Sequence, residues 1–299
     1  MAQKWDLSSS SAFANLGGSP PQARYACVLQ QFIIAGHLST DSKAIRWCEQ
    51  NDPEGWTIGD NLADSQVLPD GGDITGLVSI NDYALIFQRD RISRLQFTGG
   101  PAIASITTVA NHGCIAPGSI VVDQETVYYL SDDGFYAFNG FQSAPVGVES
   151  VNRFFWENVL KSQLDLVTAA ICPLQRIITW GFPRVSAGSS TTADSILLYN
   201  PVTQKWSYAE VDSTRLFGLA IDASVTSDTD PYNLMVGAFD RDHKFGLFSG
   251  IPVAGTLETA EWRGRGTTTV LDARPLLDGN VGSSVRIGSR YSQEDDVTY

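Results

Sequence analysis

The feature that most constrains the fold is a strand ending that recurs along the chain. Phe97, Phe138 and Phe248 each stand two positions before a glycine, and Trp47 and Tyr199 occupy the same place in two further segments. These endings are about 40 to 60 residues apart, and the longest interval contains the helical segment described below. Repeats of roughly 40–50 residues with about four strands each are typical of propeller blades. The repeat predicts an all-β chain folded as a β-propeller of five or six blades.

Residues 113–147 show one such unit in compact form. Short β-branched and aromatic runs at 119–122, 127–130 and 135–138 predict three strands, and Asp133-Gly134 between the last two is typical of a tight hairpin turn. A meander of this size cannot bury both of its faces alone, so it needs neighbouring copies.

Similar runs fill much of the remaining chain and are separated by turn residues. They predict strands at 28–35, 44–48, 74–80, 83–88, 92–97, 167–172, 176–182, 195–199, 206–210, 216–223, 232–239 and 244–248. Residues 60–73 and 186–192 are expected to be loops. Five blades are visible, and a sixth is expected to be assembled from the N-terminal arm and later residues. An ordinary β-sandwich stays open as an alternative.

Residues 150–161 differ from the rest. Val151, Phe154, Phe155 and Val159 form a helical stripe after Ser150, a favourable N-cap residue. The pattern predicts one short helix inserted between blades.

The domain prediction is a propeller with its N-terminal arm over residues 1–255 and a C-terminal β segment over 256–299. The strand-like runs of this segment do not repeat the blade, and five arginines concentrate there: Arg263, Arg265, Arg274, Arg286 and Arg290. We expect it to be an assembly contact or the start of a further domain.

The net charge of −13 argues against sequence-independent nucleic-acid binding, which needs Lys and Arg to neutralise phosphates. No signal-peptide core and no apolar run of 18 residues is visible, so we expect a soluble protein without membrane insertion. The four cysteines, with no Cys-x-x-Cys pair, are expected to be buried thiols in a reducing cytoplasm.

Three patterns hint at chemistry without completing a site. His112 and Cys114 lack the further ligands that zinc needs. Asp240 and Asp242 are more typical of a polar hairpin turn than of a calcium loop. Asp132 and Asp133 are adjacent carboxylates, expected to point to opposite sides.

Recognised catalytic motifs such as Gly-x-Ser-x-Gly or a Walker loop are missing from the sequence. The sequence therefore predicts a protein that is not an enzyme, with no catalytic, cofactor-binding or metal site and no cofactor.

Several segments in order carry a family resemblance. Asp52-Pro53-Glu54-Gly55-Trp56 and Gly113-Cys114-Ile115-Ala116-Pro117-Gly118-Ser119 are two of them. The others lie at 20–25, 45–48, 64–72, 74–77 and 130–136. Together they resemble the β-propeller tail proteins of tailed bacteriophages, above all the nozzle, or tail-stabilisation, proteins of short-tailed phages.

The resemblance implies a structural protein of the virion tail, assembled in the host bacterial cytoplasm. Its implied partners are other copies of itself in a ring, the portal and adaptor, and other tail proteins. DNA would pass through the ring during ejection without specific binding. A net charge of −13 is compatible with a lumen that repels DNA, and equally with solubility alone.

Two other functions remain open. One is a propeller that binds or hydrolyses carbohydrate, or recognises a host receptor, with Trp5, Trp56 or Trp180 as stacking platforms; core packing is the expected role for each. The other is a cytosolic interaction propeller of the kelch type, suggested by the spacing of Tyr199 and Trp206.

Overall fold

The structure is a computed structural model. It describes residues 2–5, 12–99, 103–148, 151–172, 176–185, 192–211, 213–218, 234–240 and 242–248. The chain divides into two units, Met1–Gly250 and Ile251–Tyr299. The predicted C-terminal β segment at 256–299, its arginines and the predicted boundary at residue 255 lie outside the described residues.

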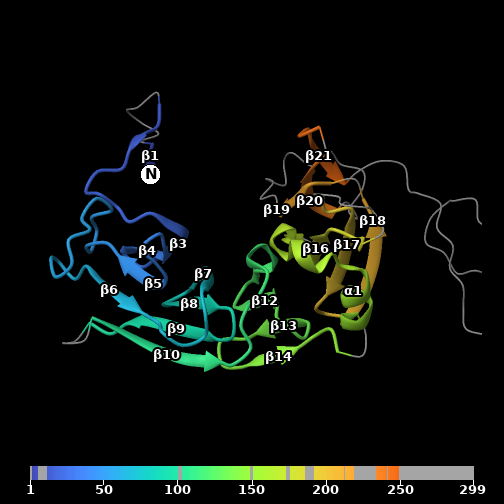
Figure 1. The fold of residues 1–299 in the computed structure, drawn as a ribbon, viewed down its shortest axis with the longest axis horizontal. Helices are drawn as coiled ribbons and strands as arrows, with labels where there is room; N and C mark the ends of the chain where they lie inside the picture. Colours follow the sequence, from blue (N-terminus) through green and yellow to red (C-terminus); the bar gives the residue numbers. More distant parts are fainter. Residues whose placement is uncertain are drawn as a thin grey trace, which may run out of the picture. The chain divides into compact units, whose positions relative to one another are not determined.

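The fold is all-β and propeller-like (Figure 1). Over residues 23–248 the described strands form five antiparallel sheets that follow one another along the chain. Within each sheet every strand pairs with the next strand in sequence. The first two sheets consist of β3 (Ala23–Leu29), β4 (Phe32–Leu38), β5 (Asp41–Trp47) and β6 (Asp64–Val67), then β7 (Ile74–Ile80), β8 (Tyr83–Gln88), β9 (Ile92–Phe97) and β10 (Ala104–Ala110).

The remaining sheets repeat this order. The third contains β11 (Val121–Asp123), β12 (Thr126–Leu130), β13 (Phe135–Phe138) and β14 (Ser143–Pro145), preceded by the 3-10 turn η1 (Pro117–Ser119). The fourth contains β15 (Thr168–Cys172), β16 (Ile177–Phe182), β17 (Ser195–Asn200) and β18 (Lys205–Glu210). The fifth has three described strands, β19 (Arg215–Gly218), β20 (Leu234–Phe239) and β21 (Phe245–Phe248).

The five predicted blades thus correspond to five sheets. The N-terminal arm forms a two-stranded sheet of its own, β1 (Gln3–Lys4) with β2 (Ala14–Asn15). Lys4 of this arm forms an ion pair with Glu54 of the first sheet's long loop. The later residues from which a sixth blade was expected lie outside the described part of the chain.

The recurring aromatic residues mark the ends of the third strands, as the repeat predicts. Trp47, Phe97, Phe138 and Phe248 close β5, β9, β13 and β21, and Tyr199 stands one residue before the end of β17. Trp47 is 3% exposed, Phe138 is fully buried and Tyr199 is 4% exposed. At Trp47, Phe138 and Tyr199 the repeat therefore marks a position where a large ring is buried.

Some predicted boundaries are wrong. The predicted strand at 28–35 is a hairpin, because β3 ends at Leu29 and β4 begins at Phe32. Gln30 in the turn has a positive φ of 51°, a conformation more common for glycine and asparagine, so the sequence gives no sign of the turn. The predicted loop at 60–73 contains β6, and β10 and β14 were also missed.

The inserted helix is present but shorter than predicted. Helix α1 spans Asn152–Asn158, and Val151 rather than Ser150 is its N-cap residue, without a side-chain capping bond. Val159 is already extended and pairs with Arg184, which ends the helix before residue 161. Leu160 then leads into the 3-10 segment η2 (Lys161–Leu166), which reaches the fourth sheet.

Hydrophobic clusters fill the spaces between neighbouring sheets, and two of them differ clearly in composition. Between the first and second sheets the buried side chains are mostly aliphatic, for example Ile34, Ile45, Ile74, Ile86 and Leu95. Between the third and fourth sheets they are rich in rings: Tyr128, Phe135, Phe155, Trp180, Phe182 and Tyr199. Helix α1 contributes Phe155 to the second cluster, so the insertion is part of the core.

Among the described residues, the helices are too short and too polar to cross a lipid bilayer.

Candidate functional site

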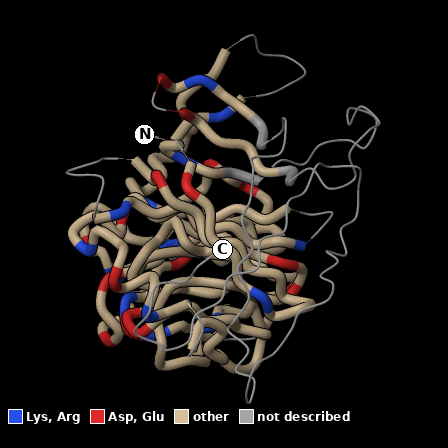
Figure 2. Tube along the Cα trace, turned by 90° about the vertical axis from the view of Figure 1, so that its right-hand side faces the viewer, with Lys and Arg blue, Asp and Glu red and all other residues tan. Residues whose placement is uncertain are grey.

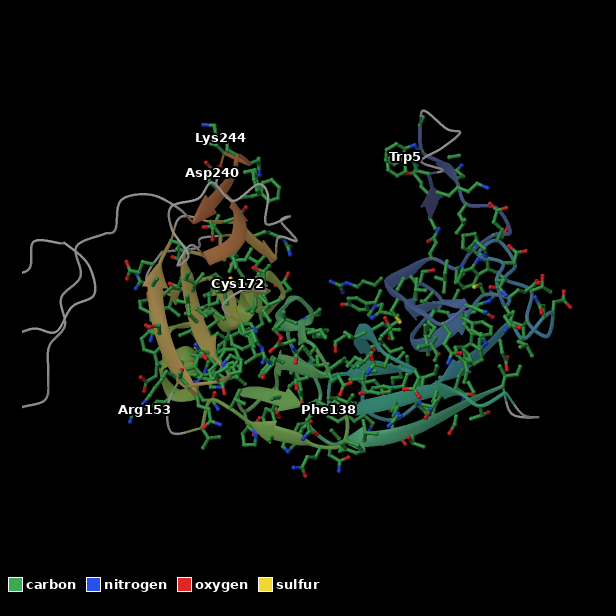
Figure 3. The ribbon with its side chains drawn as sticks, turned by 180° about the vertical axis from the view of Figure 1, so that it is seen from behind. Trp5, Phe138, Arg153, Cys172, Asp240 and Lys244 are labelled. Atoms are coloured by element: carbon green, nitrogen blue, oxygen red, sulfur yellow. The ribbon has the colours of Figure 1, made fainter. Side chains whose placement is uncertain are left out.

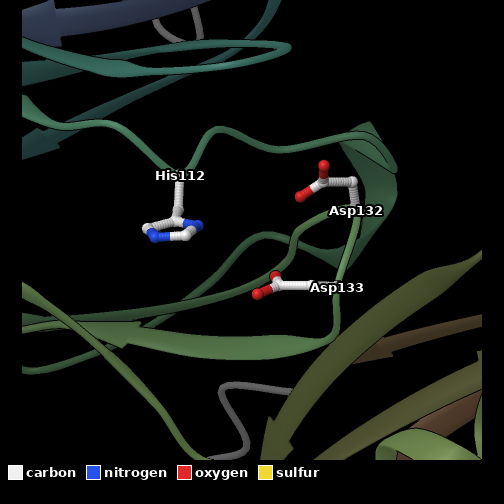
Figure 4. Close-up of side chains that lie close together, drawn as sticks. All are labelled: His112, Asp132 and Asp133. Atoms are coloured by element: carbon white, nitrogen blue, oxygen red, sulfur yellow. The ribbon is translucent and has the colours of Figure 1, made fainter.

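Three potential metal-ligating side chains converge at one end of the third sheet (Figure 4). His112 lies in the connection of residues 111–116, which joins β10 of the second sheet to η1. Asp132 and Asp133 lie in the turn between β12 and β13. Their ligand atoms all lie within 4.8 Å of one another, and all three side chains are exposed. We call these three residues the histidine–aspartate cluster.

Topology explains why these residues meet. The connection enters the third sheet near the start of β11, and β12 runs antiparallel to β11. The turn after β12 therefore lies at the same end of the sheet as the connection before β11. Residues about 20 positions apart in sequence are placed side by side.

The backbone beneath His112 is held by a close approach between sheets. Cys114 donates its backbone N–H to Gln88 O over 2.9 Å. A Cβ atom on Gly113 would lie 2.2 Å from Gln88 O and 2.4 Å from Arg89 O, which leaves room only for glycine. The His112 carbonyl accepts a hydrogen bond from the Tyr129 hydroxyl at 3.0 Å. These two hydrogen bonds thus hold the connection of residues 111–116 against the second sheet and against the third.

The imidazole ring is positioned by aromatic stacking. His112 stacks on Tyr136 with ring centroids 4.7 Å apart and planes inclined by 19°. Tyr136 in turn stacks on Tyr129 with centroids 5.9 Å apart. Both tyrosines are buried, so they give the exposed histidine ring a rigid support.

The turn that carries the carboxylates is equally well defined. Ser131 donates its backbone N–H to Gly134 O over 2.8 Å, and Gly134 has a φ of 146°. Asn152, the first residue of α1, donates to Asp133 O at 3.2 Å and accepts from Phe135 N at 3.2 Å. The predicted Asp133-Gly134 turn is therefore confirmed, and α1 holds it in place.

The prediction that the two carboxylates point to opposite sides is wrong. Alternation of side chains applies to an extended strand, whereas Asp132 and Asp133 lie in a bent segment between strands. Ser131 donates its hydroxyl to Asp132 Oδ1 at 3.2 Å, and Tyr136 donates its hydroxyl to Asp133 Oδ2 at 2.7 Å. Burial, followed by this hydrogen bond and the nearby negative charge, raises the pKa of Tyr136 above its ordinary value.

Cys114, which the sequence places beside His112, is directed elsewhere. Its thiol is fully buried and donates to Ala116 O at 3.2 Å. Burial raises the pKa of Cys114 to about 11, so it stays protonated and is a poor ligand. His112 therefore has Asp132 and Asp133, not Cys114, as its neighbours. Cys48 and Cys172 are also buried, as predicted, whereas Cys27 is half-buried.

The Asp240 segment forms the polar hairpin turn that the sequence predicts. Asp240 Oδ1 accepts from Lys244 N at 2.8 Å, and Lys244 Nζ lies 3.3 Å from Asp242 Oδ2. Figure 3 shows Asp240 and Lys244 on the hairpin between β20 and β21. His243 donates its backbone N–H to Asp240 O at 3.1 Å. These carboxylates therefore stabilise the turn and pair with Lys244.

The three candidate stacking tryptophans have different environments. Trp56 and Trp180 are buried and donate their indole N–H groups to Pro53 O and Ser119 O, which confirms the expected core packing. Trp5 is 48% exposed on the N-terminal hairpin and lies 5.3 Å from the Phe13 ring, centroid to centroid (Figure 3). Trp56 and Trp180 are therefore closed to a sugar.

A cavity of about 570 Å³ lies between the first and second sheets. Its polar lining includes Gln66, Arg91, Ser93 and Thr108. The histidine–aspartate cluster does not line this cavity, so the two features are separate places on the molecule.

Comparison with known proteins gives no family. No protein-family model matches the chain, and no curated protein matches it. Among solved structures, a complex of an S. cerevisiae Dbp5 variant with Nup159, a Gle1 variant, IP6 and ADP matches at 13% identity with a TM-score of 0.41. The match covers 75% of this chain and 61% of that chain, and a likeness this low carries no argument.

Proposed function

We propose that this protein is a structural component of a bacteriophage tail, a nozzle or hub ring that forms part of the DNA exit conduit. In this role it has no enzymatic activity and no cofactor. It contacts other copies of itself, the portal or adaptor and other tail proteins, and it resides in the virion after assembly in the host cytoplasm.

The observation that carries the proposal is the ordered set of sequence segments that resemble phage nozzle proteins. In the structure these segments lie at strands, hairpins and connections of the propeller-like sheets. Residues 113–119 enter the third sheet, 130–136 form its β12–β13 hairpin, and 52–56 and 64–72 lie in and after the long loop of the first sheet. The propeller-like fold that the resemblance implies agrees with the all-β sheets observed.

The charge distribution also supports a conduit that DNA passes without binding. The chain carries 33 acidic and 20 basic residues, and the two kinds are interspersed over the described part of the trace (Figure 2). Each phosphate contact made by a lysine or arginine adds salt-dependent affinity for DNA. Acidic residues interspersed among the basic ones in the described part of the chain weaken such retention.

The test is to find the protein in particles. Antibodies raised against the full-length chain should label the tail end of virions from the same source in immunogold electron microscopy. Quantitative mass spectrometry of purified virions should give several copies per particle. The control is the same antibody after adsorption to the purified chain, which should no longer label the virions. Absence of this protein from the particles would overturn the proposal.

A carbohydrate-binding or receptor-recognising propeller is the second candidate. The exposed Trp5–Phe13 pair and the polar cavity between the first and second sheets favour it. A glycan array with the full-length chain distinguishes the two functions, together with the variants Trp5→Ala and Arg91→Ala. Specific glycan binding that either variant abolishes supports the second candidate.

A further inference from the structure

We infer that the histidine–aspartate cluster is a binding site for a divalent transition-metal cation, with Zn²⁺ as the best-suited occupant. The site would hold the connection of residues 111–116 to the β12–β13 turn. This inference goes beyond the proposed role in a tail and does not depend on it.

The ligand set fits this class of ion. An imidazole nitrogen and two carboxylate oxygens supply three protein ligands, which leaves open positions for water. Such mixed nitrogen and oxygen ligands suit zinc and its neighbours, and the affinity order of divalent metals places zinc well above manganese. Calcium and magnesium prefer sites made of oxygen alone.

Electrostatics favours a cation between these side chains. The oxygens of Asp132 and Asp133 offered as ligands lie within 4.8 Å of each other. None of the ion pairs found among the described residues involves either carboxylate. Two like charges this close repel, and a dication removes the repulsion.

The neighbouring groups are those expected around a metal site. Hydrogen bonds from Ser131 and Tyr136 each occupy one oxygen of Asp132 and Asp133, and they leave Asp132 Oδ2 and Asp133 Oδ1 for a metal. The ring of His112 is aligned by stacking on Tyr136. Such outer contacts orient metal ligands and raise their affinity.

The equivalent hairpin of the fifth sheet provides a matched comparison within the same chain. The β20–β21 turn carries two aspartates, as the β12–β13 turn does, and a histidine stands beside them in the same turn: Asp240, Asp242 and His243. Its carboxylates are bonded to Lys244, and the three side chains do not form a group of converging ligand atoms. The residue types alone are thus insufficient, and the geometry distinguishes the two turns.

The first experiment measures metal binding to the full-length chain. The metal-free protein is dialysed against ZnCl₂ under reducing conditions, and bound zinc is quantified by elemental mass spectrometry. We expect one tightly bound Zn²⁺ per chain in the unchanged protein and in the control His243→Ala. His112→Ala and Asp133→Asn should each weaken binding at least about 10-fold, and Tyr136→Phe should weaken it about 10-fold by releasing Asp133.

The second experiment uses the unchanged protein, so its result does not depend on whether a variant folds. The chain has three histidines, so their ring proton signals in NMR spectra are few. Adding Zn²⁺ should shift the signals of His112 and leave those of His37 and His243 in place. Mn²⁺, which prefers oxygen and nitrogen ligands to thiolates, should selectively broaden the same His112 signals.

Three results would overturn the inference. They are unchanged His112 signals at saturating Zn²⁺, equal zinc binding by the unchanged protein and His112→Ala, and zinc binding that disappears only when the cysteines are alkylated. The melting temperature in EDTA identifies a variant that has lost its fold rather than its metal, and in that case the NMR experiment decides.

Discussion

Two spaces between neighbouring sheets are filled by different kinds of side chain. One lies between the first and second sheets and the other between the third and fourth, and all four sheets have the same strand order. Aliphatic side chains dominate the first space, whereas aromatic rings make up a much larger share of the second. Phe135 lies at the centre of the ring cluster, with centroids 5.0 Å from Phe155, 4.7 Å from Trp180 and 5.3 Å from Trp206. Phe155 belongs to the inserted helix, so the insertion and the large rings occur together.

The difference shows that the strand repeat determines the sheets but not the side chains that fill the space between them. An inserted segment occupies space that the repeat does not provide for, and close packing must then be restored by other side chains. Substitutions in the two spaces measure how far each depends on its own filling.

The largest effect is expected at the helix. Phe155→Ala removes a fully buried ring from the cluster between the third and fourth sheets and should lower the free energy of unfolding by about 3–5 kcal/mol. Urea denaturation measures the loss. Phe141→Ala, at a side chain that is 85% exposed, is the control and should stay within about 0.5 kcal/mol. If Phe155→Ala lowers the free energy of unfolding no more than Phe141→Ala does, the helix is not part of the core.

The contact between the second and third sheets offers a different kind of test, because the backbone at Gly113 also meets backbone carbonyls there, in addition to the side chains of a third buried cluster. Gly113→Ala would press a methyl group onto the carbonyls of Gln88 and Arg89 and should cost about 1–3 kcal/mol. Gly246→Ala, where an added Cβ meets nothing within 4 Å, is the control. Equal urea midpoints for the two variants would contradict the close approach.

A smaller effect is expected in the aliphatic space. Ile86→Val removes one buried methylene between the first and second sheets and should lower the free energy of unfolding by about 0.5–1.5 kcal/mol. Val28→Ala, at a position that is 61% exposed, is the matched control. A cost for Ile86→Val as large as that of Phe155→Ala would remove the distinction between the two spaces.

The smallest expected effect is a difference in how stability depends on pH in the two clusters. Burial raises the pKa of Cys27, beside the aliphatic cluster, from 9.0 to about 12, and that of Tyr128, in the ring cluster, from 10.0 to about 12. The unfolded chain therefore releases each proton at lower pH than the folded chain. The stabilisation is complete below the unfolded pKa and declines as pH rises towards the folded pKa.

The two groups consequently lose their contributions in different windows, from about pH 9 for Cys27 and from about pH 10 for Tyr128. Urea midpoints relative to the unchanged protein should rise between about pH 8 and about pH 9.5 for Cys27→Ala. Tyr128→Phe should show its relative rise only above about pH 10. Parallel pH profiles for all three proteins would show that neither group is buried as described.

The sequence predicts strands correctly where buried residues alternate with exposed ones or follow one another without interruption. The first three strands of the second sheet, β7, β8 and β9, were predicted with their observed bounds, because their apolar runs are separated by clear turn residues. The outer strands β6, β10 and β14 were missed, and none of their residues is fully buried. Hydrogen bonding to the third strand, which no local pattern reveals, makes them strands.

The candidate site was missed for a related reason. Each member was noticed, but His112 was paired with Cys114 by proximity in sequence, and Asp132 with Asp133 as a strand-like pair. Antiparallel topology, which places the entry of a sheet beside the turn after its second strand, would have joined them. Tyr136, which supports both His112 and Asp133, looks in the sequence like any other strand residue.

The pairing of every strand with its immediate neighbour in sequence bears on how the chain folds. In each described sheet the paired strands are neighbours in sequence, so their hydrogen bonds can form without waiting for distant parts of the chain. A chain emerging from the ribosome can therefore complete one sheet before the next is synthesised. Helix α1 and the Asn152 contact with the β12–β13 turn then join the third sheet to the fourth, so synthesis past residue 152 is the step at which the growing chain first secures that turn.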